Sequence, residues 1–217
     1  METAKGSAAA RRCVIVGGAD IGRYDRIRAR LRENDFYICC DSGLKHREEL
    51  GIVPELIVGD FDSYENPSLP TETIVLPREK DDTDTAFAVK TALSRGAQDF
   101  LLIGCAGGRM DHTLGNLSLL LLLDGRGKRA VLLDDFSEME IVSPDRPVQI
   151  EDRYAYFSLL SIGGAARDIT ISGAKYPLFN AEITSENQYG ISNEVLPGGT
   201  AEVSLREGRL LLIKVLP

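Results

Sequence analysis

Apolar and polar residues alternate in two different ways along this chain, and the change falls near residue 135. In the first part, short unbroken apolar runs end in glycine or aspartate, and stretches with helical spacing lie between them. Such runs are typical of strands that are buried on both faces of a parallel sheet. The runs cover residues 13–16, 36–40, 56–58, 73–76, 100–103 and 130–133, with helices expected at 24–32, 44–50, about 84–96 and 113–123. This alternation predicts an α/β layer with a largely parallel sheet.

Beyond residue 135 no strong helical pattern appears, and strand-like segments follow one another. We expect strands at residues 139–142, 154–162, 168–172, 200–205 and 209–215. Arg206, Glu207 and Gly208 are expected to form a hairpin turn between the last two. The chain is therefore predicted to have two domains, an α/β domain over residues 1–142 and an all-β domain over residues 143–217.

Composition narrows the class of protein. The chain has 217 residues, 43% of them hydrophobic, and a formal net charge of -8, which argues against nucleic-acid binding. The four cysteines lie in or beside apolar runs, as expected for reduced, buried thiols in a cytoplasmic protein. Residues 1–12 are expected to be a short disordered segment, not a signal peptide, and the apolar run 117–123 is too short to span a membrane.

The segment from Gly59 to Ser63 places two aspartates one residue apart, directly after a buried strand. In an extended segment the side chains of Asp60 and Asp62 point the same way, and a cation between two such carboxylates relieves their repulsion. Asp, Gly and Ser also favour turns, so the segment alone fits a turn equally well.

Further aspartates and glycines follow the other strands of the first part. Ligands of parallel α/β sheets bind beyond the carboxyl ends of the strands, so these side chains are expected to share one crevice. Clustered carboxylates without paired Cys or His suit Mg²⁺, which bridges phosphate groups, and a nearby arginine and glycines suit the phosphates themselves. Phosphoryl-type transfer is therefore the leading class. The aspartates are Asp41, Asp60, Asp62, Asp81, Asp84 and Asp111.

Several of these residues also have plain structural interpretations. Asp82 or Thr83 can cap the helix that begins there, and Asp111 can cap the leucine-rich helix. His46 is expected on the surface of a helix, and His112 fits either a site residue or the first turn of a helix. The glycines between residues 17 and 22 have the spacing of a P-loop, but the lysine and hydroxyl residue that a P-loop needs are absent.

Taken together, the motifs resemble those of the thiamine pyrophosphokinase family. The likeness covers nearly the whole chain and is specific in combination. It is carried by Asp41-Ser42-Gly43, Gly59-Asp60-Phe61-Asp62-Ser63, Lys80-Asp81 with Thr83-Asp84, Gly107-Gly108-Arg109 with Asp111-His112 and Asn116, and Gly190-Ile191-Ser192-Asn193-Glu194.

The resemblance implies a Rossmann-like catalytic domain followed by a β-sandwich, a homodimer with the site at the subunit interface, and pyrophosphoryl transfer from ATP to thiamine. Catalytic residues would be Asp60, Asp62, Asp84 and Asp111, and Mg²⁺ ligands Asp60, Asp62, Asp81 and Asp84. ATP would be bound by Asp41, Ser42, Gly43, Lys80, Asp81, Thr83, Gly108, Arg109, His112 and Asn116. Thiamine would be bound by Ser192 and Asn193, with Tyr189 or Tyr176 as its aromatic partner because the chain has no Trp.

Two other functions fit the same residues. One is a different Mg²⁺-dependent pyrophosphokinase, phosphotransferase or nucleotide phosphatase, which would be told apart by its products. The other is a thiamine- or nucleotide-binding sensor that binds ligand without turnover. The complete set of aspartates argues against a sensor.

Overall fold

The structure is a computed structural model that describes residues 11–62 and 69–217. The chain forms two compact units, Met1–Asp135 and Phe136–Pro217. The division falls before strand β7 (Ser137–Val142), whereas the sequence placed this segment in the first domain. The reason is pairing: β7 pairs along its whole length with β14 (Leu210–Val215) of the second unit.

The first unit is built on a parallel sheet, as the apolar runs predicted. Across the described residues, the strands lie in the order β6-β5-β1-β2-β3-β4, and each neighbouring pair is parallel. The strands are β1 (Cys13–Val16), β2 (Phe36–Cys40), β3 (Leu56–Gly59), β4 (Glu72–Val75), β5 (Asp99–Ile103) and β6 (Arg129–Leu133). All residues of β1 and β3 are buried, which is why these strands are continuously apolar.

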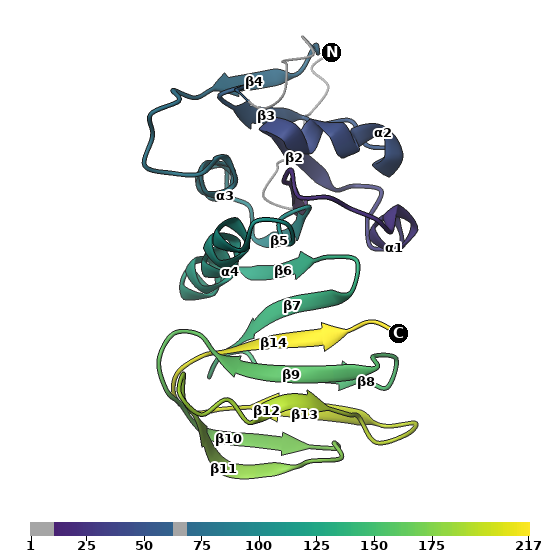
Figure 1. The fold of residues 1–217 in the computed structure, drawn as a ribbon, viewed down its shortest axis with the longest axis vertical. Coiled ribbons are helices and arrows are strands. Elements are labelled where there is room, and N and C mark those ends of the chain that lie inside the picture. Colours follow the sequence, from purple (N-terminus) through teal and green to yellow (C-terminus); the bar gives the residue numbers. More distant parts are fainter. Residues whose placement is uncertain (1–10, 63–68) are drawn as a thin grey trace, which may run out of the picture. The chain divides into compact units, whose positions relative to one another are not determined.

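Helices cover both faces of this sheet. Figure 1 shows α3 and α4 on one side of the strands and α1 and α2 on the other. The helical segments are α1 (Tyr24–Arg28), the 3₁₀-helix η2 (Asp41–His46), α2 (Arg47–Leu50), α3 (Asp84–Ser94) and α4 (Met110–Gly125). The leucine-rich stretch therefore lies in a longer helix than expected, and no helix in the described part of the chain has the length and apolar character needed to cross a membrane.

The strand order reverses between β1 and β5, and the loops after these two strands touch. The backbone N–H of Gly17 donates to the carbonyl of Ile103 at 2.9 Å, and that of Ala19 donates to Gly104 at 2.9 Å. A Cβ on Gly17 would lie 2.5 Å from the Gly104 oxygen, so this close approach requires glycine. Such a reversal is where parallel α/β sheets open a crevice for ligands.

The second unit is entirely antiparallel. Its strands form two sets, β12-β9-β14-β7 and β11-β10-β13-β8. The strands not yet given are β8 (Val148–Glu151), β9 (Tyr156–Ser161), β10 (Ala166–Ser172), β11 (Leu178–Ile183), β12 (Gly190–Asn193) and β13 (Thr200–Ser204). One buried cluster holds side chains from both sets, including Leu159 of β9 and Ile171 of β10.

Two expectations for the second unit were wrong. Strands β8, β11 and β12 were not among the segments expected from the sequence. The expected hairpin at Arg206–Gly208 does not exist, because β13 pairs with β8 and β10 while β14 pairs with β7 and β9. The turn instead carries the chain from one sheet to the other.

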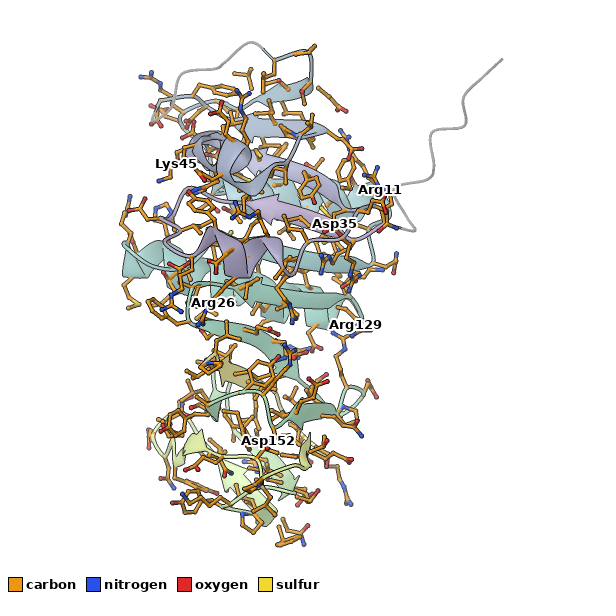
Figure 2. All side chains as sticks on the ribbon, turned by 90° about the vertical axis from the view of Figure 1, so that its right-hand side faces the viewer. Arg11, Arg26, Asp35, Lys45, Arg129 and Asp152 are labelled. Atoms are coloured by element: carbon orange, nitrogen blue, oxygen red, sulfur yellow. The ribbon has the colours of Figure 1, made fainter. Side chains whose placement is uncertain are left out.

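At the amino ends of the parallel strands, a buried ion pair fastens the chain. Arg12 and Asp35 lie 2.7 Å apart with 9% and 0% of their side chains exposed. Figure 2 shows Arg11 beside Asp35 here, and Lys45 on the opposite side of the unit. The four cysteines are free and buried, as expected. Of the expected N-terminal segment, residues 1–10 lie outside the described residues.

Candidate active site

A cleft of about 620 Å³ opens at the carboxyl ends of the parallel strands. It gathers the loops that follow β1, β2, β3, β4 and β5, which is where the sequence placed the crevice. Predicted site residues that line it are Asp41, Ser42, Asp60, Asp62, Lys80, Asp81, Thr83, Asp84, Gly108, Arg109, His112 and Asn116. Gly43 and Asp111 are not among the lining residues.

Three carboxylates converge in this cleft. Asp41, Asp60 and Asp62 each have an oxygen within 4.8 Å of the others. The segment after β3 is a turn and not extended as expected, because Phe61 has a φ of 55° and the Asp62 N–H donates to Asp60 Oδ1 at 3.3 Å. The turn and the site are therefore the same structure. Ser63, the last residue of the motif, lies outside the described residues.

Asp41 is the most constrained of the three. Only 7% of the residue is exposed, its φ is 41°, and its Oδ1 has no hydrogen-bond partner among the described residues. Burial raises the pKa of its carboxyl group, and the neighbouring aspartates raise it further. An unpaired buried oxygen beside two more carboxylates is a suitable ligand set for Mg²⁺, which prefers oxygen donors.

Lys80 supplies positive charge inside the cluster. Its Nζ lies 2.5 Å from Asp60 Oδ2 and 2.9 Å from Asp84 Oδ1. The hydrogen bond from Lys80 lowers the pKa of Asp60, so Asp60 is ionised at neutral pH. Asp82, in the same loop, pairs with Lys90 at 2.7 Å. Of these carboxylates, Asp60 and Asp84 therefore face the cluster with a shared counter-ion.

Thr83 has the structural role that the sequence allowed. Its Oγ1 accepts a hydrogen bond from the backbone N–H of Ala86 at 3.2 Å, which caps α3. Because Thr83 also lines the cleft, the cap fixes the start of α3 at the site. Asp81 lines the cleft two residues before it.

Asp111 lies beside the cleft and is bound by an arginine. Arg109 donates to both of its carboxylate oxygens, with Nη2 2.6 Å from Oδ2, and both side chains are mostly exposed. This hydrogen bond lowers the pKa of Asp111 to about 2, so Asp111 is a weak proton acceptor. Gly43 also acts outside the cleft: a Cβ there would lie 2.1 Å from the Val16 carbonyl oxygen, so glycine lets η2 pack on β1.

Two residues of α4 differ in role. Asn116 is buried and its Nδ2 donates to the Cys105 carbonyl at 2.8 Å, which holds the glycine-rich loop after β5. His112 is exposed at the cleft, and its backbone N–H donates to Asp111 Oδ1 at 2.9 Å. His112 therefore both lies in the first turn of the helix and lines the site.

Two residues at or behind the cleft were not predicted as part of the site. Arg78 lines it and, within the described part of the chain, forms no hydrogen bond or ion pair, which leaves its guanidinium available for an anion. A basic residue two positions before Lys80 was the available signal. His46, expected on the surface, is only 1% exposed, because it hydrogen-bonds to Tyr24 and to the Ala19 carbonyl behind the loop after β1.

The predicted thiamine-binding residues lie in the second unit. Asn193 is 5% exposed, and its side-chain amide hydrogen-bonds to backbone groups. Nδ2 donates to the Tyr176 carbonyl at 2.8 Å, and Oδ1 accepts from the Tyr176 and Glu194 N–H groups. Ser192 is exposed with a φ of 58°, and the Tyr189 hydroxyl donates to the Glu182 carbonyl at 2.6 Å. Asn193 thus holds Tyr176, whose ring is exposed.

A carboxylate-lined cleft at the carboxyl edge of a parallel sheet, with lysine and arginine beside it, is typical of enzymes that bind phosphorylated nucleotides. Two family models match the chain: "Thiamin pyrophosphokinase, catalytic domain" over residues 27–132, and "Thiamin pyrophosphokinase, vitamin B1 binding domain" over residues 145–210. The chain belongs to the thiamin pyrophosphokinase family.

Individual relatives agree with the family models. The thiamine pyrophosphokinase of Bacillus subtilis (strain 168) is 30% identical over 208 residues, which make up 92% of this chain and 96% of that protein. A crystal structure of the Bacillus subtilis enzyme has a TM-score of 0.84 at 28% identity, covering 95% of this chain and 99% of that chain. The thiamin pyrophosphokinase structure from Geobacillus thermodenitrificans gives 0.81 at 28% identity, with 95% and 98% covered.

Proposed function

We propose that this chain is a thiamine diphosphokinase that works through the acidic cleft of its first unit. The reaction transfers a pyrophosphoryl group from ATP to the hydroxyl of thiamine and gives thiamine diphosphate and AMP. The observation that carries the residue assignment is the convergence of Asp41, Asp60 and Asp62, one buried oxygen of which has no partner among the described residues.

The acidic residues hold the metal in this proposal. Asp60 and Asp62 would hold Mg²⁺ together with Asp81 and Asp84 from the next loop, with Asp41 as a further oxygen ligand. A metal ion held by these residues would supply positive charge to the triphosphate. The turn at Phe61 orients the first two carboxylates, and the cap at the start of α3 orients the others. These residues position the donor for the transfer.

The cations and the backbone hold the phosphates. Lys80 and Arg78 reach them from the loop before α3, and Arg109, oriented by Asp111, reaches them from the loop before α4. The remaining donor-site residues that we assign to ATP are Ser42, Thr83, Gly108, His112 and Asn116, and Gly43 supports Ser42 by letting η2 pack on β1.

The thiamine hydroxyl does not require a strong base. The transition state of phosphoryl transfer is loose, so the hydroxyl keeps its proton until late. Asp111 is unsuited to take that proton early because its pKa is about 2. We assign Asp111 instead to orienting Arg109. In this proposal the reaction is promoted by positioning of the two substrates and by the metal ion.

We assign thiamine to the second unit, which the vitamin B1 binding model matches. Ser192 contacts the ligand, and Asn193 supports Tyr176, whose exposed ring suits a cationic thiazolium. Tyr189 is the alternative aromatic. The proposal includes a Rossmann-like first unit, a β-sandwich second unit, a homodimer with the site at the subunit interface, and a cytoplasmic location.

The test is a product assay. The purified chain is incubated with ATP, Mg²⁺ and thiamine, beside an EDTA control, and the products are separated by chromatography. We expect thiamine diphosphate and AMP in equal amounts, lost with EDTA and reduced at least a hundredfold in Asp62→Asn. Asp99→Asn, the same change at the other edge of the sheet, is the matched control and should stay near wild type.

Other products would contradict the assignment. ADP or inorganic phosphate in place of AMP would indicate a different phosphotransferase or a phosphatase. Binding of thiamine without turnover under varied metals and pH would indicate a sensor.

A further inference from the structure

The loop between β1 and α1 lines the cleft with Gly18, Ala19 and Asp20, and hydrogen bonds to other parts of the unit fix its backbone. Four of its backbone N–H groups already donate to protein acceptors. Those of Gly17 and Ala19 bind carbonyls of the β5 loop. Those of Gly22 and Arg23 bind the Asp135 carboxylate at 2.7 and 2.9 Å. The loop is therefore a wall of fixed shape.

His46 fixes this wall from behind. Its Nε2 lies 2.9 Å from the Ala19 carbonyl oxygen, and its Nδ1 lies 2.6 Å from the Tyr24 hydroxyl. Because a carbonyl only accepts, Nε2 carries the hydrogen, and Nδ1 accepts from the Tyr24 hydroxyl. Burial lowers the pKa of His46, so the neutral ring with this tautomer is the form present at pH 7. One buried side chain thus joins η2, α1 and the wall.

The wall also packs directly on the motif that follows β2. A Cβ on Gly18 would lie 1.9 Å from Ser42 Oγ, so the two loops touch at a position where no side chain fits. Ser42 follows Asp41 of the carboxylate cluster. The wall therefore lies against the Ser42 side of the cleft.

The chemistry that the wall offers is not that of a phosphate site. Asp20 is exposed, with its carboxylate 2.8 Å from Lys45 Nζ, and it repels phosphate while accepting hydrogen bonds from hydroxyl or amino groups. Gly18 and Ala19 add small, mostly apolar surface. A nucleoside has an uncharged aromatic face together with hydroxyl groups as donors, which matches both features.

We propose that Gly18, Ala19 and Asp20 form the nucleoside-binding wall of the ATP site, and that His46 is a positioning residue that sets this wall through its hydrogen bond to Ala19. The inference rests on the proposed assignment of the cleft to ATP. The carboxylate cluster and the cations near it take the triphosphate, and the wall takes the other end of the donor.

Two ligands test binding at the two ends of the donor separately. AMP carries the nucleoside, whereas inorganic tripolyphosphate with Mg²⁺ carries only the phosphates. Affinities are measured by calorimetry for the full chain and for His46→Leu, which removes both hydrogen bonds. We expect His46→Leu to weaken AMP binding about two- to tenfold, the range for loss of the hydrogen bond to Ala19 that sets the wall, and to leave tripolyphosphate affinity within twofold. The KM for ATP should rise by the same factor, with kcat and the KM for thiamine within twofold.

Three further variants make the test sharper. His46→Gln keeps an N–H that can reach Ala19 and should recover most of the AMP affinity. Tyr24→Phe removes only the hydroxyl and should weaken AMP about twofold, with Tyr37→Phe at the other end of the sheet as its matched control. Asp20→Ala should weaken AMP without weakening tripolyphosphate.

Equal losses of AMP and tripolyphosphate in His46→Leu would overturn the nucleoside assignment. A fall in kcat and in both substrate affinities, unrelieved by His46→Gln, would show a purely structural role and would overturn the positioning role. If Asp62→Asn bound tripolyphosphate as wild type does, the ATP assignment of the cleft would itself be wrong, and so would the assignment of the wall to the nucleoside.

Discussion

Asp41→Asn should make the metal-free protein more stable while destroying its activity. The oxygens of Asp41, Asp60 and Asp62 lie within 4.8 Å of one another. Two unit charges about 4.8 Å apart repel by about 3.5 kcal/mol at an effective dielectric constant of about 20. Lys80 and solvent offset part of this repulsion, so we expect the variant to gain about 1–3 kcal/mol, or about 2–10 °C in Tm.

Backbone geometry does not oppose the substitution. Asp41 has a φ of 41°, in the left-handed region where Asn is as well tolerated as Asp. The Asn amide can also donate to a neighbouring carboxylate, which the Asp41 carboxylate cannot do.

Thermal unfolding with EDTA and with increasing Mg²⁺ measures both effects. Wild type should gain stability as Mg²⁺ binds, and Asp41→Asn should gain much less, while product formation falls at least a hundredfold. A variant that is less stable than wild type in EDTA, or that Mg²⁺ stabilises equally, would refute the reasoning that Asp41 is an uncompensated carboxylate facing the metal.

Four further outcomes follow from single contacts. Lys80→Met should lower stability in EDTA by about 1–3 kcal/mol and recover with Mg²⁺ in thermal unfolding, whereas Lys90→Met, which removes an exposed pair, should cost under about 1 kcal/mol. Arg78→Ala should raise the KM for ATP about fivefold at unchanged Tm, as expected for loss of one charge-assisted hydrogen bond. Because the pKa of His46 is lowered on folding, wild type should lose stability as the pH falls below the ordinary histidine pKa, and His46→Gln should lose less; equal losses would place the titration elsewhere. Asn193→Ala leaves backbone groups unbonded, so its Tm should fall and the KM for thiamine should rise in steady-state assays.

The parallel sheet was predictable because its strands are buried on both faces. Continuous apolar runs such as Cys13–Val16 and Phe36–Cys40 gave the strand bounds directly. In the second unit, β11 is mostly exposed and lacks an apolar stripe, so local pattern was weak there. By contrast β8 alternates buried and exposed residues, a period-two signal that was present and overlooked. A turn between two strands does not reveal whether they pair, which is why the hairpin prediction failed.

The site was predictable in outline and not in its contacts. The parallel topology brings strand-end loops together, so carboxylates after β2, β3 and β4 had to share a crevice. The sequence did not reveal which carboxylates have a counter-ion, because the counter-ions lie far along the chain, as in the pairing of Asp60 with Lys80. His46 was misplaced for the same reason: a short helix has no reliable buried face, and its burial depends on Tyr24.

Non-glycine residues with a positive φ fall into two groups in this fold, those at shifts in strand register and those at the candidate site. Among the described residues, non-glycine φ values are positive at Asp41, Phe61, Asp168, Asn180 and Ser192. Asp168 and Asn180 lie in β10 and β11, where shifts in strand register account for them, and Ser192 lies at a similar shift in β12. No strand register explains Asp41 and Phe61. Each such residue costs about 1–3 kcal/mol, and a turn with two facing carboxylates adds repulsion to that cost. A cation bound between the carboxylates would offset the repulsion, and so the strained positions support the proposed metal site independently of the motifs.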